Sequence, residues 1–316
     1  MPASDHAHIA DSHALPQLTR LPVKQSIFLG DTFFQEGWHE FCGEFGSESV
    51  AAAFRLSLLI AKPEAVVTRS LEKLLDWLED RNFGIVAMER FRFDRHLTRA
   101  LWGHHWNAVT PEHKATVDLL VSASDSVAFV LIDKTPAAIP CSVRLCEGKG
   151  SASPELRKAT HLRSVLGSCN QLLNYVHSPD EPADVVRELS VTFEKEKLRS
   201  ILRRVSDGLT LQKSDLLETA QNTYARNAAA TISLPEVCDA LAGNIANASR
   251  REQLLESVMS GKANLRGIAD ECASSGSPLT TWQRVVLAAF TITSPRVGRQ
   301  RLIPAAGFVE WEAAAR

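Results

Sequence analysis

Three segments of strand length constrain the fold of this 316-residue chain more than any other feature. Residues 56–61 and 127–132 are nearly all apolar, residues 85–93 combine apolar residues with the charged Glu89, Arg90 and Arg92, and segments with apolar residues on one helical face lie between them. Buried strands are nearly continuous apolar runs, whereas amphipathic helices repeat their apolar residues every three to four positions. In the first helical segment, Ser70 is placed to cap the helix. This order suits a sheet that helices cover on at least one face.

After Phe193 the pattern changes, and only amphipathic helical segments follow. We therefore expect an all-α C-terminal domain and see no internal repeat in it. The beginning of the chain is small and polar, and the next stretch is rich in Phe and Trp. The predicted division is a disordered N-terminus (1–22), an aromatic-rich extension (23–53), an α+β domain (54–195) and a helical C-terminal domain (196–316).

Composition excludes several classes of protein. The formal net charge is −2, so no general attraction to nucleic acid or to an anionic membrane is expected. No apolar run reaches membrane-spanning length, and the first residues contain no apolar signal-peptide core. The six cysteines are scattered and form no C-x-x-C pair, which favours reduced thiols in a cytoplasmic protein. No set of three or four ligands has the spacing of a metal site, so no protein-held metal is predicted.

One histidine, His177, lies in the polar, turn-forming stretch 174–180. A helix start follows it at Glu181 and Pro182, and that helix carries Glu188. A carboxylate returning on the next helix can hold an imidazole in one tautomer and leave its other nitrogen facing a cleft. Such an imidazole can accept a phosphoryl group. Taken alone, however, this stretch is more often a capped turn with an incidental histidine.

A second stretch changes that interpretation. The apolar run that starts at Leu58 ends in Lys62 and Pro63. Together the two stretches resemble the nucleoside diphosphate kinase family, whose first strand ends in a motif like I-K-P-D-A-V and whose catalytic loop has the form N-x-x-H-G-S-D. The resemblance covers roughly residues 54–195. It implies a ferredoxin-like antiparallel sheet with covering helices.

The resemblance also implies roles. His177 is expected to take the γ-phosphoryl group of ATP as phosphohistidine and to pass it to a nucleoside diphosphate. Lys62 is expected to contact phosphate, and Glu188 to orient the histidine. Mg²⁺ is expected to bridge the nucleotide phosphates without protein ligands. The other nucleotide- or phosphate-binding residues that it implies are Trp102, Arg144, Arg163 and Asn174.

The sequence departs from the family pattern in the pockets around this chemistry. Trp102 stands where the family has a tyrosine, and the stretch 107–114 lacks the phenylalanine that stacks on the nucleotide. Gly150 replaces a phosphate-contacting threonine, and Pro179 replaces the serine of the catalytic loop. The base and acceptor pockets are therefore expected to differ. The loop that shapes the hexamers of the family also differs, so the resemblance does not fix the oligomeric state, and a homo-oligomer is one alternative.

Three hypotheses follow. The first is a nucleoside diphosphate kinase-like phosphotransferase that acts on nucleotide substrates. The second is ATP-dependent modification of a small molecule at the same site. The third is a catalytically weak nucleotide-binding module with a regulatory role, for which the helical region is the interaction surface. Retention of His177, Lys62 and Glu188 favours the first two.

Overall fold

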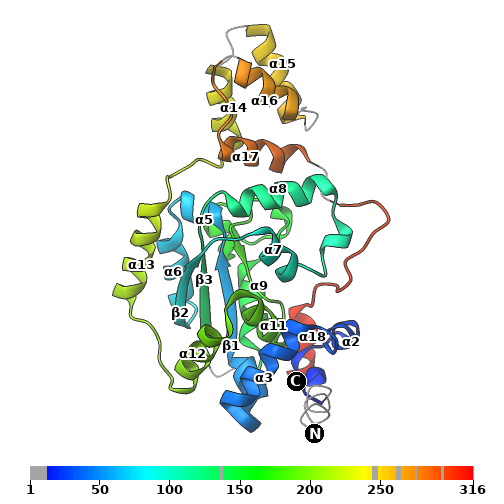
Figure 1. Ribbon diagram of the computed structural model, residues 1–316, viewed down its shortest axis with the longest axis vertical. Coiled ribbons are helices and arrows are strands. Elements are labelled where there is room, and N and C mark those ends of the chain that lie inside the picture. Colours follow the sequence, from blue (N-terminus) through cyan, green and yellow to red (C-terminus); the bar gives the residue numbers. More distant parts are fainter. Residues whose placement is uncertain are drawn as a thin grey trace.

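The computed structural model describes residues 13–135, 138–243, 248–260, 265–274, 276–292 and 295–315 (Figure 1). A four-stranded antiparallel sheet lies at the centre of this described part, in the order β2-β3-β1-β4. Its strands are β1 (Leu56–Ala61), β2 (Phe83–Phe91), β3 (Ser126–Asp133) and β4 (Val176–His177). The predicted antiparallel sheet with covering helices is thereby confirmed.

The register of the sheet brings the two sequence motifs together. All six residues of the central strand β1 are buried, as its continuous apolar run predicts. The short strand β4 pairs with the end of β1, so that His177 lies opposite Ile60 and Val176 opposite Ala61. Lys62 follows immediately, and its backbone N–H donates to the carbonyl oxygen of Tyr175 at 2.8 Å. The Lys-Pro motif and the histidine loop are therefore neighbours at one edge of the sheet.

Helices cover this sheet, and two of them start with a side-chain cap. The Asp94 carboxylate caps one helix and the Thr110 hydroxyl caps another, each accepting from a backbone N–H of the first turn. Ser70 is the N-cap residue of the helix that begins at Leu71, as predicted, but its side chain forms no capping hydrogen bond. No described helix is both long and apolar enough to cross a membrane. The helices of this part are α5 (Pro63–Val67), α6 (Leu71–Glu79), α7 (Arg95–Leu101), η2 (Trp106–Ala108), α8 (Pro111–Ser122), α9 (Cys141–Lys149), η3 (Pro154–Leu156), α10 (Leu162–Val165) and α11 (Pro182–Thr192).

The N-terminal part is more ordered than the sequence suggested. Residues 1–12 lie outside the described residues, but residues 13–18 are helical, and Leu15 and Leu18 are fully buried. The expected disorder is therefore wrong for residues 13–22, because these leucines enter the common core. The aromatic extension is helical and packs on α11 through α3. Its elements are α2 (Pro22–Phe28), α3 (Thr32–Phe45), η1 (Gly46–Glu48) and α4 (Ser49–Arg55).

The described part of the chain after α11 is all helical, as predicted, but it is not one detached unit. Helix α12 packs against α3 and β2, α13 packs against α5, α6 and β2, and α18 packs against α4 and α9. Helices α14 to α17 gather beyond α8, which α17 contacts (Figure 1). The sequence also predicts a break in the helical pattern near Gly261, and residues 261–264 lie outside the described residues. The elements are α12 (Lys195–Ser206), α13 (Lys213–Arg226), α14 (Leu234–Gly243), α15 (Ala248–Met259), α16 (Leu265–Ser274), α17 (Thr281–Thr291) and α18 (Phe308–Ala315).

Residues 295–303, here called the C-terminal strap, run from the α17 side of the molecule towards α18 (Figure 1). The strap lies along the loop 104–109, with which it forms hydrogen bonds and one isolated β-bridge. Its contacts are the Val109–Pro295 bridge, Arg296 N–H to the Ala108 oxygen at 2.9 Å, Leu302 N–H to the His104 oxygen at 3.1 Å and the Asn107 amide to the Gln300 oxygen at 2.5 Å.

Candidate active site

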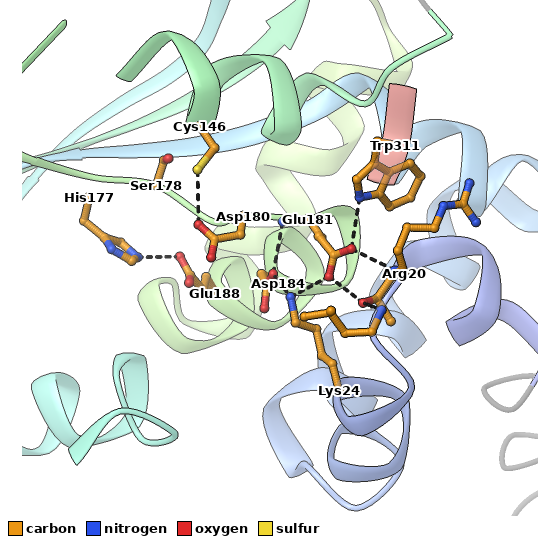
Figure 2. A network of polar contacts seen from close by, with 12 residues as sticks. Arg20, Lys24, Cys146, His177, Ser178, Asp180, Glu181, Asp184, Glu188 and Trp311 are labelled. Atoms are coloured by element: carbon orange, nitrogen blue, oxygen red, sulfur yellow. Dashed lines mark hydrogen bonds and ion pairs between the residues drawn. The ribbon is translucent and has the colours of Figure 1, made fainter. Parts of the chain in front are cut away.

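His177 is held at both ring nitrogens. Its Nε2 lies 2.8 Å from a carboxylate oxygen of Glu188 on α11, and its Nδ1 lies 3.2 Å from the indole nitrogen of Trp102 (Figure 2 shows the Glu188 contact). A carboxylate accepts and an indole N–H donates, so Nε2 carries the proton and Nδ1 carries the lone pair. The sequence predicted the pairing with Glu188, and the structure places the two groups in contact. Nδ1 is therefore the nucleophilic atom of this imidazole.

Trp102 covers that nucleophilic atom. The indole stands nearly perpendicular to the imidazole, with the ring centroids 5.6 Å apart, and it stacks on Phe93 on its other side. Because its N–H occupies the lone pair of Nδ1, the indole has to shift before His177 can attack an electrophile. The same N–H could then donate to an oxygen of the transferred group.

Lys62 lies beside the histidine loop but is paired within the protein. Its ammonium lies 2.7 Å from the Glu64 carboxylate and donates to the Leu172 carbonyl oxygen at 2.9 Å. Two of its three N–H bonds are thereby used. Burial lowers the pKa of Lys62, against the opposing effect of the Glu64 charge. These contacts leave one N–H of the ammonium for another acceptor, and Glu64 neutralises the charge.

Arg163 does not present its guanidinium to a ligand. The side chain is buried and donates to three backbone carbonyl oxygens, those of Gly150 at 2.8 Å, Val176 at 2.8 Å and Asn174 at 3.3 Å. Burial lowers the pKa of Arg163 to about 10. The sequence assigned this arginine to phosphate, whereas the structure uses it to brace the loop on both sides of Tyr175. Spacing along the chain could not reveal that, because the acceptors are backbone groups.

Arg144 lies away from the histidine. It forms an ion pair with Asp133 at the end of β3, and its guanidinium lies 5.3 Å from the ring centre of Phe83. Asp133 pairs with Phe83 at the edge where β1 begins, whereas His177 pairs with Ile60 near the end of β1. Ile60 also pairs with Ala128, five residues before Asp133 on β3, and five residues correspond to roughly 17 Å along a strand. The structure therefore does not bring Arg144 to His177.

Asn174 is half-buried and lies at the start of the histidine loop. Its side-chain amide donates to the Gln171 carbonyl oxygen at 2.7 Å, and its own carbonyl accepts from Arg163. These contacts shape the loop and leave the side-chain oxygen for another donor. Asn174 thus stays close to the histidine, as the sequence predicted, with its ligand-binding role still a prediction.

Sequence reasoning missed Glu64 and Tyr175. The Glu64 carboxylate is buried, neutralises Lys62 and accepts from the Tyr175 backbone N–H at 3.1 Å. Tyr175 has a φ of 63°, an unfavourable value for a bulky residue, and its side chain lines a cavity of about 870 Å³ next to the C-terminal helices. Glu64 occupies the acidic position of the I-K-P-D-A-V-like motif, so that motif contained the missing signal.

A further histidine, His105, lies near the site in a largely buried position. Burial lowers its pKa to about 4, and the charge of Arg301 on the C-terminal strap acts in the same direction. His105 is therefore neutral at physiological pH. Among the described residues, no group of three His, Cys, Asp or Glu side chains is arranged to hold a metal ion. Any divalent cation at this site would therefore depend on ligands other than such a cluster, such as nucleotide phosphates.

Comparison with known proteins identifies the part of the chain that carries this site. The family model described as nucleoside diphosphate kinase matches residues 56–198. A nucleoside diphosphate kinase of Thermococcus kodakarensis is 24% identical over 144 residues, which are 45% of this chain and 78% of that protein.

The chain is also similar to solved structures over about the same share of its length. The nucleoside diphosphate kinase of Aquifex aeolicus is 23% identical, with a TM-score of 0.39, over 45% of this chain and 96% of its own. That of Pyrobaculum aerophilum is 16% identical, with a TM-score of 0.38, over 46% of this chain and 98% of its own.

The matched residues begin with the first residue of β1 and end within α12. They include the four strands of the described sheet and also His177, Glu188 and Lys62. The N-terminal helices and the helices beyond α12 lie outside the match. Residues 56–198 of this chain therefore form a nucleoside diphosphate kinase-like domain.

Proposed function

We propose that this protein transfers the γ-phosphoryl group of ATP through His177 to a nucleoside diphosphate or a related acceptor. The observation that carries the proposal is the imidazole itself, whose Nε2 proton is held by Glu188 while Nδ1 keeps its lone pair. A histidine held in this tautomer is a competent covalent nucleophile. The family match over the same residues supports a nucleotide phosphotransferase in general.

The proposed reaction has two steps. In the first, the indole of Trp102 moves away and Nδ1 of His177 attacks the γ-phosphorus. An N–P bond forms, the bond from phosphorus to the bridging oxygen breaks, and ADP leaves with that electron pair. In the second step, a terminal phosphate oxygen of the acceptor attacks the phosphoryl group, and the N–P bond breaks. Glu188 stabilises the positive charge that develops on the imidazole in the first step.

Three further residues complete the proposed site. Lys62 is suited to neutralise phosphate charge once Glu64 yields its ammonium. Asn174, at the start of the histidine loop, would hydrogen-bond the nucleotide with its side-chain oxygen. Mg²⁺ would be held by the nucleotide phosphates and would neutralise their charge. Arg144 and Arg163 are not included, because Arg144 pairs with Asp133 and three of the five N–H groups of Arg163 bind backbone carbonyl oxygens.

The test uses the purified chain, γ-labelled ATP and Mg²⁺. The label should be acid-labile and alkali-stable, should be absent from His177→Ala, and should leave the protein when a nucleoside diphosphate is added. His39→Ala, which changes an exposed histidine on α3, is the matched control and should label normally. Normal labelling of His177→Ala would exclude His177 as the carrier.

A second candidate is ATP-dependent modification of a small molecule at the same site. The C-terminal strap supports it, because residues outside the family match bond to the loop 104–109, next to Trp102. That loop adjoins the stretch where the resemblance places the base clamp, so the strap adds contacts beside the expected base pocket. Product analysis decides between the two candidates. Label that forms on His177 but is never discharged by any nucleoside diphosphate would favour the second.

A third candidate is a nucleotide-binding module with weak catalysis. It is supported by two contacts within the site: the Trp102 indole N–H donates to Nδ1 of His177, and Glu64 forms an ion pair with Lys62. ATP binding by calorimetry together with an absence of label would favour it.

A further inference from the structure

Glu181 is a buried carboxylate that receives hydrogen bonds from two distant parts of the chain. Its side chain is fully buried and lies at the centre of the network in Figure 2. It accepts from the Arg20 backbone N–H at 2.8 Å, the Lys24 ammonium at 2.7 Å and the Trp311 indole N–H at 3.0 Å. The Thr19 hydroxyl donates to it as well. Both oxygens of this carboxylate are therefore satisfied within the protein.

All of these donors lie outside the nucleoside diphosphate kinase-like domain. Residues 19–24 precede the family match, and Trp311 belongs to α18, more than one hundred residues after it. The two segments also contact each other, since the Arg20 guanidinium lies 4.1 Å from the ring centre of Trp311. Glu181 is thus the point at which the N-terminal and C-terminal segments are joined to the domain.

The position of Glu181 in the chain gives this junction a consequence for the site. Glu181 is the N-cap residue of α11 and forms a capping box with Asp184. The strand β4 with His177 leads into Glu181, and α11 returns Glu188 to the same histidine. The segment from His177 to Glu188 therefore closes on itself through the His177–Glu188 contact, and Glu181 lies where its loop part meets α11. A displacement of this residue moves Glu188 relative to His177.

Neighbouring contacts hold the rest of the connecting loop. The Lys149 ammonium donates to the Ser178 hydroxyl at 2.7 Å, and the Cys146 thiol donates to the Asp180 carboxylate at 3.2 Å. These donors come from α9, inside the domain. The Glu181 end of the loop, by contrast, depends on Thr19, the 20–24 stretch and α18.

We propose that Glu181 is a positioning residue, through which the segment 19–24 and the helix α18 set the distance between His177 and Glu188. The proposal rests on the proposed function for its effect on rate, but its structural part does not. Without these donors, the buried carboxylate would keep only the capping-box hydrogen bond from the Asp184 backbone N–H, and the start of α11 would shift to reach water or another donor. Phosphoryl transfer is sensitive to such shifts, because small misplacements of a nucleophile cost large factors in rate.

The test is Trp311→Phe, which keeps the aromatic packing and removes the N–H that binds Glu181. Trp38→Phe is its matched control, because Trp38 is also buried while its indole nitrogen has no hydrogen-bond partner in the described structure. Three quantities are measured for each variant: the melting temperature, the rate of His177 phosphorylation at saturating ATP, and the ¹⁵N shifts of the His177 imidazole.

For Trp311→Phe we expect phosphorylation to slow by at least about fivefold, the factor for one lost hydrogen bond, with the KM for ATP within about twofold. The ¹⁵N shift of Nε2 should change as the contact with Glu188 loosens. Trp38→Phe should leave both readouts unchanged. A lower melting temperature with an unchanged rate and unchanged imidazole shifts would overturn the proposal and leave Glu181 a purely structural group.

Glu181→Gln is the second variant if Trp311→Phe does not fold. The amide would turn an N–H₂ group towards the Lys24 ammonium, so a larger change in the imidazole shifts is expected. Unchanged shifts in this variant would also overturn the proposal. If the wild-type protein forms no phosphohistidine, the proposed function fails, whereas the imidazole shifts of the variants still test the positioning role.

Discussion

Replacing Arg163 by lysine separates two roles for this buried side chain. The resemblance assigns it to phosphate, whereas the structure shows its guanidinium donating to the carbonyl oxygens of Gly150, Val176 and Asn174. A lysine keeps the positive charge and is a good phosphate ligand, but it is not a planar donor with fixed geometry. If Arg163 braces the loop, Arg163→Lys should therefore lower stability and leave the affinity for ATP almost unchanged.

The size of the effect follows from the three contacts. A lysine ammonium reaches about one of the three carbonyl oxygens, so two hydrogen bonds from a charged donor are lost. At about 1.5 kcal/mol for each, the free energy of unfolding falls by about 3 kcal/mol. For a chain of this size, that loss lowers Tm by roughly 6 to 12 °C, at about 2 to 4 °C per kcal/mol.

The assay combines thermal unfolding, followed by circular dichroism, with titration of ATP by calorimetry. Arg203→Lys is the control, because Arg203 is an exposed arginine on α12 and should change neither quantity. An unchanged Tm together with markedly weaker ATP binding in Arg163→Lys would refute the bracing role and restore the assignment to phosphate.

Further predictions concern the cover on the histidine and two buried titrating groups. Trp102→Phe removes the N–H that occupies Nδ1 of His177, so diethyl pyrocarbonate should modify this histidine several-fold faster, as followed by mass spectrometry. Burial raises the pKa of Asp184 to about 7 despite its contact with Lys24, so the folded state holds a proton that the unfolded state releases, and stability falls as pH rises from about 4 to 7. Asp184→Asn should lose this slope and gain roughly 2 kcal/mol over the wild type between pH 5 and 8 in urea unfolding; parallel pH profiles would contradict the assignment. The pKa of His105 lies near 4, below its unfolded value, so its contribution is lost as pH falls from about 6.5 towards 4, and His105→Gln should flatten that acid limb.

The elements that the sequence predicted well are those with a strong local signal. Strands β1, β2 and β3 lie within two residues of their predicted bounds, because β1 and β3 are nearly continuous apolar runs and the first part of β2 is apolar and buried. Strand β4 has only two residues, Val176 and His177, and no run of that length can be distinguished from a loop. The helical state of residues 13–18 was missed because its cause is burial of Leu15 and Leu18 by distant helices.

The candidate site divides in the same way. The contact between His177 and Glu188 could be predicted, because both belong to one loop and the helix that follows it. The hydrogen-bond partners of Arg163 could not be predicted, because they are backbone carbonyl groups, which every residue has whatever its type. The junction at Glu181 joins residues separated by 130 and more positions, and only the folded chain brings them together.

The junction at Glu181 also bears on how this protein is made. Trp311 is translated 130 residues after Glu181, and synthesis at about 5 to 20 residues per second spreads that gap over roughly 7 to 26 s. Domains generally fold as units while the chain is still growing, so the strands and α11 can assemble in that interval. During that interval, the Glu181 carboxylate of the nascent chain lacks the hydrogen bond from the Trp311 indole N–H. If the junction positions His177 as proposed, the His177–Glu188 pair reaches its final geometry only after the ribosome has passed Trp311. A chain that ended before Trp311 would contain the motifs at Lys62 and His177, but its His177 and Glu188 would not be held at the correct distance.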